Sequence, residues 1–92
     1  MDSSLSVVFK ALSDPNRLKI IEMLKNGEVC ACNILENCEF SQPTLSHHMG
    51  ILIRAGVVIS RKEGKWIHYS LNSESLDSII KYLNLLMDSS KN

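Results

Sequence analysis

The sequence has no long apolar run. None of its apolar stretches approaches the roughly 20 residues that a membrane-spanning helix needs. The first ten residues, MDSSLSVVFK, lack the basic start and apolar stretch of a secretory signal. We therefore expect a cytoplasmic protein with no membrane partner, in a compartment where thiols stay reduced.

Aromatic residues are scarce as well. They make up 5% of the chain, whereas hydrophobic residues make up 45%. This profile favours a small helical protein rich in Leu and Ile over a β-sandwich. The 92 residues are enough for one domain, 1–92. A domain of this size often needs disulfides, a metal or a partner subunit for stability.

Cysteine is rare but clustered, with Cys30, Cys32 and Cys38 within nine positions. An odd number of cysteines, two of them one residue apart, argues against a structural disulfide framework. Roles as metal ligands or reactive thiols are favoured instead.

The chain has no net charge, which taken alone argues against a nucleic-acid partner. Its charge is unevenly distributed, however. Residues 41–71 contain one acid, Glu63, against four basic residues and all three histidines, and both flanking segments are net negative. Attraction to phosphate depends on such a local basic patch more than on the total charge.

Apolar periodicity predicts five helices and a hairpin. Leu5, Val8, Phe9 and Leu12 indicate an amphipathic first helix. A second helix starts after Asp14 as N-cap with Pro15 in its first turn, and Gly27 is its C-cap candidate. Its expected buried face carries Leu18, Ile21 and Leu24.

A short third helix is expected from about Cys30 to Cys38, and a fourth begins at Ser41 as N-cap. The segments 57–61 and 66–71 then predict a β-hairpin, with Glu63-Gly64 as its turn. A closing helix capped by Ser73 follows. Two short helices, a turn and a basic hairpin are typical of a winged helix-turn-helix, mostly α with a β-hairpin.

The start of the fourth helix predicts DNA contacts. A recognition helix reads bases with its N-terminal residues, and Gln42 can pair with adenine. Thr44 and Ser46 can reach bases or phosphates. The full predicted DNA-binding set is Ser41, Gln42, Thr44, Ser46, His47, His48, Arg61, Lys62 and Lys65. The last three lie in the wing, where they can follow phosphates or enter the minor groove.

Plainer roles stay open for several of these residues. Gln42 could be a solvated surface residue. Lys62 and Lys65 could be solvated residues of an ordinary turn. His47 and His48 project about 100° apart, so only one of them is expected at a phosphate. Trp66, His68 and Tyr69 are interpreted as hairpin packing rather than as ligands or stacking platforms.

Four stretches together resemble one family: LSDPNRLKIIEML, EVCACNIL, FSQPTLSHHMGIL and AGVVISRKEGKWIHYSL. This combination is similar to the ArsR/SmtB metal-sensing repressors, and its cysteine pair to their arsenical-resistance branch. The resemblance implies a homodimer that leaves its operator when an ion binds, with no enzyme activity and no organic cofactor. The first and last helices would form the dimer interface.

The resemblance also implies As(III) or Sb(III) as inducer, bound by Cys30 and Cys32. In the branch's best-known arrangement a further cysteine occupies the place of Leu35. Cys38 stays open as a ligand or a core residue. The closing helix has no histidine for a zinc site, and MDSSLSVVFK has no cysteine for a cadmium- or lead-type site.

Helix geometry predicts how Cys30 and Cys32 would have to move in order to hold one ion. In a regular helix, positions i and i+2 lie about 200° apart, so Cys30 and Cys32 could hold one ion only if the helix turn opened. That distortion would move the recognition helix. The alternatives are a thiol pair that senses another soft metal, an oxidant or a sulfur species, a thiol enzyme, and a dimeric interaction module without DNA binding.

Overall fold

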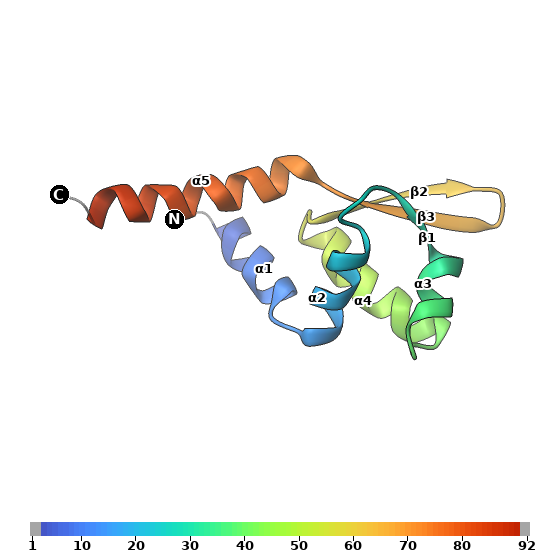
Figure 1. The fold of residues 1–92 in the computed structure, drawn as a ribbon. Helices are drawn as coiled ribbons and strands as arrows, with labels where there is room; N and C mark the ends of the chain where they lie inside the picture. The colour runs from blue at the N-terminus through green and yellow to red at the C-terminus, as the bar shows by residue number, and fades with distance from the viewer. Residues whose placement is uncertain (1–2, 91–92) are drawn as a thin grey trace.

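The computed structural model describes residues 3–90 and contains five helices and three strands. The helices are α1 (Ser3–Leu12), α2 (Pro15–Met23), α3 (Ala31–Asn37), α4 (Gln42–Arg54) and α5 (Ser73–Ser90). The strands are β1 (Val29–Cys30), β2 (Val58–Glu63) and β3 (Trp66–Leu71). The molecule is elongated, 52 × 21 × 21 Å, with α5 extending at one end and the β2–β3 hairpin at the other (Figure 1). The predicted winged helix-turn-helix is confirmed.

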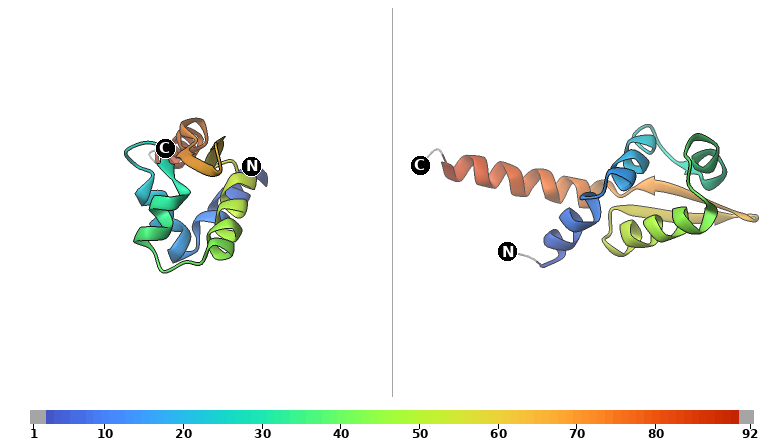
Figure 2. Two further views of the ribbon diagram at one scale, coloured as in Figure 1. Left: turned by 90° about the vertical axis from the view of Figure 1, so that its right-hand side faces the viewer. Right: turned by 90° about the horizontal axis from the view of Figure 1, so that it is seen from below.

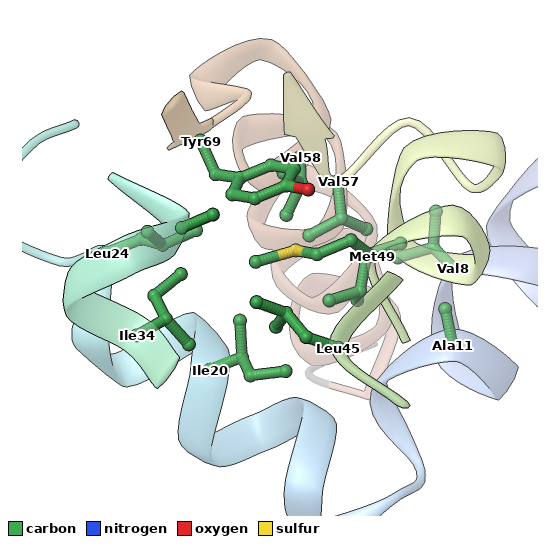
Figure 3. Packing of buried hydrophobic residues seen from close by; sticks show 12 residues of the cluster. Val8, Ala11, Ile20, Leu24, Ile34, Leu45, Met49, Val57, Val58 and Tyr69 are labelled. Atoms are coloured by element: carbon green, nitrogen blue, oxygen red, sulfur yellow. The ribbon is translucent and has the colours of Figure 1, made fainter. Parts of the chain in front are cut away.

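The core lies where α1, α2, α3 and α4 meet the base of the hairpin (Figure 3). Its fully buried side chains include Ile20, Ile34, Met49 and Leu52. On α2 the predicted face is wrong in part, because Leu18 is 47% exposed whereas Ile20 is 0% exposed. Ile20 and Leu24 lie one turn apart and point into the helix cluster, whereas Leu18 projects about 200° away from Ile20.

Helix α2 begins as the sequence predicts but ends earlier. The Asp14 carboxylate accepts hydrogen bonds from the backbone N–H groups of Asn16 and Arg17, with Pro15 in the first turn. The helix ends at Met23, and Gly27 follows in a turn with φ of 126°. Gly27 therefore supplies a left-handed conformation for the loop and not the helix cap itself.

The cap of α5 also differs from the prediction. Asn72, not Ser73, precedes the helix, and its side-chain oxygen accepts from the Glu74 N–H at 3.2 Å. Its side-chain amide donates to the Gly56 carbonyl at 2.9 Å. Asn72 therefore links the start of α5 to the segment after α4. A search for Ser, Thr, Asp or Asn caps could have identified Asn72 as the cap.

The hairpin is part of a three-stranded antiparallel sheet with the order β1-β3-β2. Glu63 pairs with Trp66, so the loop residues are Gly64 and Lys65 rather than Glu63 and Gly64. Gly64 has φ of 63° and no other described residue of the loop has a positive φ, the pattern of a type II′ turn. The strand β1 was not predicted, because two residues carry no periodic signal.

Helix α5 extends beyond the body of the protein and lies near α1 (Figures 1 and 2). The rings of Phe9 and Tyr82 are 6.4 Å apart between centroids. Large apolar side chains on this half of the molecule stay exposed: Val7, Phe9, Ile80, Leu83, Leu85, Leu86 and Met87. Among the described residues, no helix is both long and apolar enough to cross a bilayer.

Candidate nucleic-acid interface and thiol site

The N-terminus of α4 presents a polar surface. Ser41 caps the helix as predicted, because its Oγ accepts from the Thr44 N–H at 3.3 Å and donates to the Thr44 hydroxyl at 2.9 Å. Gln42, Thr44, Ser46 and His47 are all exposed. Buried Leu45 and Met49 anchor the opposite side of the same helix. The helix therefore presents four of the predicted DNA-binding side chains to solvent.

His48 differs from its neighbour. It is 8% exposed, and its Nδ1 lies 3.3 Å from an Arg17 guanidinium nitrogen. Its ring also lies against Phe40, 5.5 Å between ring centroids. The burial of the His48 imidazole between α2 and the turn before α4 argues against the prediction that this side chain contacts DNA. His47 is the exposed member of the pair.

The wing carries its basic residues in two different environments. Lys62 and Lys65 are exposed, and no ion pair is recorded for either in the part of the chain that the structure describes. Arg61 instead forms a two-pronged hydrogen bond with Glu28, at 3.0 and 2.6 Å, and a third contact with Glu63 at 3.1 Å. Its positive charge is therefore largely neutralised by two carboxylates.

These contacts shift two pKa values in the direction that favours the ion pair. The hydrogen bond from Arg61 lowers the pKa of the Glu28 carboxyl below its ordinary value. Hydrogen bonds to Glu28 and Glu63 raise the pKa of the Arg61 guanidinium. Sequence reasoning missed Glu28 as part of the wing, since 33 residues separate it from Arg61.

A surface pocket lies where α3, the start of α4 and the wing meet. Its lining includes Ala31, Leu35, Gln42, Ser46, Lys65 and Trp66. Two predicted DNA-reading side chains and one wing lysine therefore share one pocket with the helix that follows Cys30. Tyr69 is 5% exposed and packs in the core, as predicted, whereas Trp66 is 36% exposed and forms part of the pocket wall.

The two sulfurs of Cys30 and Cys32 lie together and are joined as a disulfide. The prediction that they point apart is wrong. Helix α3 begins at Ala31, and Cys30 is its N-cap, in an extended conformation with φ of −69° and ψ of 141°. This places the two Cα atoms 5.2 Å apart, and the Cys30 sulfur accepts from the Cys32 N–H at 3.3 Å.

The disulfide also differs from the free thiols that the sequence favoured. It closes a loop across one intervening residue and so joins no distant segments, which agrees with the predicted lack of a disulfide framework. Once reduced, the pair would offer two adjacent thiolates, the donors that soft ions prefer. The helix turn would not need to open to bring them together.

Cys38 lies at the other end of α3 as its C-cap. Its thiol donates to the Met23 sulfur at 3.6 Å, and it packs beside the core. Within residues 3–90, no three His, Cys, Asp or Glu side chains gather as a metal site. The structure therefore favours the core interpretation of Cys38 over the ligand one.

Strand β1 places the thiol pair beside the wing. Cys30 pairs with His68 on β3, and His68 pairs with Arg61 on β2. Directly opposed residues of a sheet project from the same face, so these three side chains form a row across the strands. Tyr69 and Val29, on the other face, pack on the core. A two-residue strand has no periodic signal from which this pairing could be predicted.

Comparison with known proteins assigns the family. Residues 14–60, about half of the chain, match "Bacterial regulatory protein, arsR family". The chain is also 48% identical to an "Arsenical resistance operon repressor" of Staphylococcus aureus, over 95% of this chain and 84% of that protein. The chain belongs to the arsR family. An arsR-family protein of this fold is a DNA-binding transcriptional regulator, which disfavours the thiol-enzyme alternative.

Other relatives agree with this membership. The repressor of the same name from Staphylococcus xylosus is 50% identical, over 89% of this arsR-family chain and 79% of that protein. The solved "ArsR-like Transcriptional Regulator from Rhodococcus sp. RHA1" superimposes with a TM-score of 0.85 at 26% identity, over 97% of this chain and 84% of the other.

Proposed function

We propose that this arsR-family repressor binds operator DNA as a homodimer and releases it when As(III) or Sb(III) binds at Cys30 and Cys32. The observation that carries the proposal is the position of the sulfur pair. It lies at the junction of β1 and α3, where β1 pairs with the wing strand β3 and α3 lines a pocket together with Gln42 of α4. The names of the Staphylococcus repressors support a metalloid as the inducer.

On the DNA side, α4 would enter the major groove with its N-terminal turn. Gln42 and Ser46 lie one turn apart and share the pocket with Lys65 of the wing. Base readout by α4 and phosphate contact by Lys62 and Lys65 could therefore occur together on one duplex. Ser41, Thr44 and His47 remain proposed DNA contacts. Arg61 would contact phosphate only when its hydrogen bond to Glu28 is broken.

On the sensor side, Cys30 and Cys32 would act as thiolate ligands after reduction. As(III) would supply a soft acceptor for the two thiolates, and a small thiol, water or another side chain would complete its ligands. Cys30 lies on the strand that pairs with β3, and Ala31 and Leu35 line the pocket with Gln42. A change in sulfur spacing would thus be transmitted to the wing and to α4.

The homodimer is supported by the exposed apolar side chains of α1 and α5. Ile80, Leu83 and Leu86 are each about half exposed, although they lie on the apolar stripe of α5. A second copy related by a two-fold axis would cover them. The proposal places the protein in the cytoplasm, where operator DNA is found and thiols stay reduced.

The disulfide favours one second candidate, an oxidant or sulfur-species sensor. Two thiols joining as Cys30–Cys32 lose two electrons and two protons, and a peroxide taking them up becomes two waters. The same strand and pocket contacts would transmit this change. Both candidate functions include operator binding through α4 and the wing. They differ in what reacts with the thiol pair, a metalloid ion in one and an oxidant or sulfur species in the other.

Fluorescence anisotropy with a labelled fragment of the protein's own promoter tests the proposal. We expect tight, salt-dependent binding by the reduced protein and release on adding As(III). Gln42→Ala should weaken binding by about 1–3 kcal/mol. Asn26→Ala, an exposed amide in the loop after α2, is the matched control and should bind as wild type.

The outcomes separate the candidates. Release by peroxide with indifference to As(III) would replace the metalloid function with the redox one. Equal affinity of the Gln42→Ala and Asn26→Ala proteins would refute the proposed reading role of α4, and no DNA binding at low salt would remove the repressor function altogether.

A further inference from the structure

Arg17 joins three helices through its side chain. Its Nε donates to the Ala11 carbonyl, near the end of α1, at 2.6 Å. Another guanidinium nitrogen lies 3.3 Å from Nδ1 of His48, in the middle of α4. Asp14 caps the Arg17 backbone N–H at 3.1 Å and so fixes its position at the start of α2. One residue thus connects α1, α2 and α4.

The contact with His48 constrains the imidazole chemically. A guanidinium only donates hydrogen bonds, so His48 Nδ1 has to accept. This requires a neutral ring with its proton on Nε2. Protonation would make Nδ1 a donor, break the bond and place a second positive charge beside Arg17 in a site that is 8% exposed.

The ring is enclosed, and its neighbours offer no compensating charge. Phe40 lies against it from the turn before α4, and His47 lies 5.7 Å away between ring centroids on α4 itself. Within the described residues, Arg17 and His47 are the charged or titratable groups recorded against His48, and no carboxylate is among them.

The position of His48 in α4 connects this contact to DNA binding. His48 follows Ser46 and His47 directly; exposed Ser46 projects about 200° from His48, on the opposite side of the helix from the Arg17 contact, and exposed His47 about 100° from it. A contact that holds one side of a helix determines how the other side is presented. We propose that Arg17 is a positioning residue that holds the recognition helix through neutral His48, so that protonation of His48 lowers the affinity for operator DNA.

The test compares two proteins, His47→Gln and His47→Gln/His48→Gln, in operator anisotropy titrations from pH 7.5 to pH 5.5. Imidazoles take up protons across this interval. Both proteins lack the exposed His47 imidazole, so they differ only at position 48. A glutamine at position 48 can still accept from Arg17 through its side-chain oxygen but cannot titrate.

We expect the single variant to lose affinity on the order of tenfold on acidification, and the double variant to change by less than about twofold. His68 is present in both proteins, so the ratio of their affinities isolates His48. Parallel pH profiles would overturn the proposal. Arg17→Lys, which keeps the charge but not the two-pronged geometry, should bind more weakly at pH 7.5 and show a smaller pH effect.

A measurement on the unmodified protein keeps the proposal testable if a variant fails to fold. Nitrogen NMR of His48 at pH 7.5 should show the tautomer with its proton on Nε2. A proton on Nδ1, or a charged ring, at that pH would overturn the proposal. Because the proposal rests on operator binding, loss of all DNA affinity in wild type would refute the proposed function, while the NMR result would stand by itself.

Discussion

At the scale of single residues, the ion pair between Glu28 and Arg61 limits the charge of the wing. Two carboxylates, Glu28 and Glu63, hold a side chain that is 51% exposed and lies beside the proposed phosphate contacts. A phosphate has to compete with them for the guanidinium. Glu28 is also two residues from Cys30, so the sensor segment and the wing share this contact.

We predict that Glu28→Gln raises operator affinity a few-fold and steepens its salt dependence by about one released counterion. The physical reason is that Arg61 loses its two-pronged carboxylate partner and keeps only the Glu63 contact, so a phosphate competes for it more easily. Anisotropy titrations at several salt concentrations measure both quantities. Glu36→Gln removes an equal charge at an exposed position of α3 and is the control. An equal gain in both variants would show that net charge, not Arg61, is responsible.

The pKa shift of Glu28 gives the ion pair its own pH dependence. Because Arg61 lowers the pKa of the Glu28 carboxyl in the folded state, the contact contributes stability above the ordinary carboxyl pKa. That contribution is lost as the pH falls through the lowered pKa.

At the scale of elements, the sequence predicted those parts of the fold that local chemistry determines. Asp14-Pro15 and Ser41 start their helices where expected, because a cap acts within three residues. The two strands of the hairpin were also predicted, with the turn displaced by one residue. Periodicity and capping depend on residues close together in the sequence, so these elements can be predicted without the tertiary structure.

The elements that depend on distant partners were not predictable in this way. Strand β1 exists because Val29 and Cys30 pair with Tyr69 and His68, some 40 positions later in the chain. That pairing makes Cys30 extended and starts α3 at Ala31, one residue later than expected, which brings the sulfurs together. The burial of His48 likewise depends on Arg17, 31 residues away.

At the scale of the whole molecule, α1 and α5 leave an apolar surface uncovered at the end opposite the wing (Figure 2). A helix with such a stripe normally buries it against another element. The body of this protein covers Leu76 and Ile79 but not the later turns of α5. The proposed two-fold dimer covers those turns and sets the spacing of two α4 helices for successive major grooves.

We predict that Leu83→Glu converts the dimer to monomer at micromolar concentration, weakening association by about 2 kcal/mol or more, because a carboxylate would be buried in an apolar interface. Sedimentation velocity measures the shift. Ser78→Glu adds the same charge on the polar side of α5 and should stay dimeric. A wild-type protein that sediments as a monomer across this range would contradict the proposed assembly.

The most direct test of the sensor mechanism is an As(III) titration of the reduced protein on operator DNA, comparing wild type, Cys38→Ser and Cys30→Ser/Cys32→Ser. We predict release of wild type and of Cys38→Ser at similar As(III) concentrations, because Cys38 packs against Met23 and away from the pair. The double variant should stay bound throughout. Release of the double variant by As(III), or a wild type that keeps its operator when loaded, would contradict the role of Cys30 and Cys32.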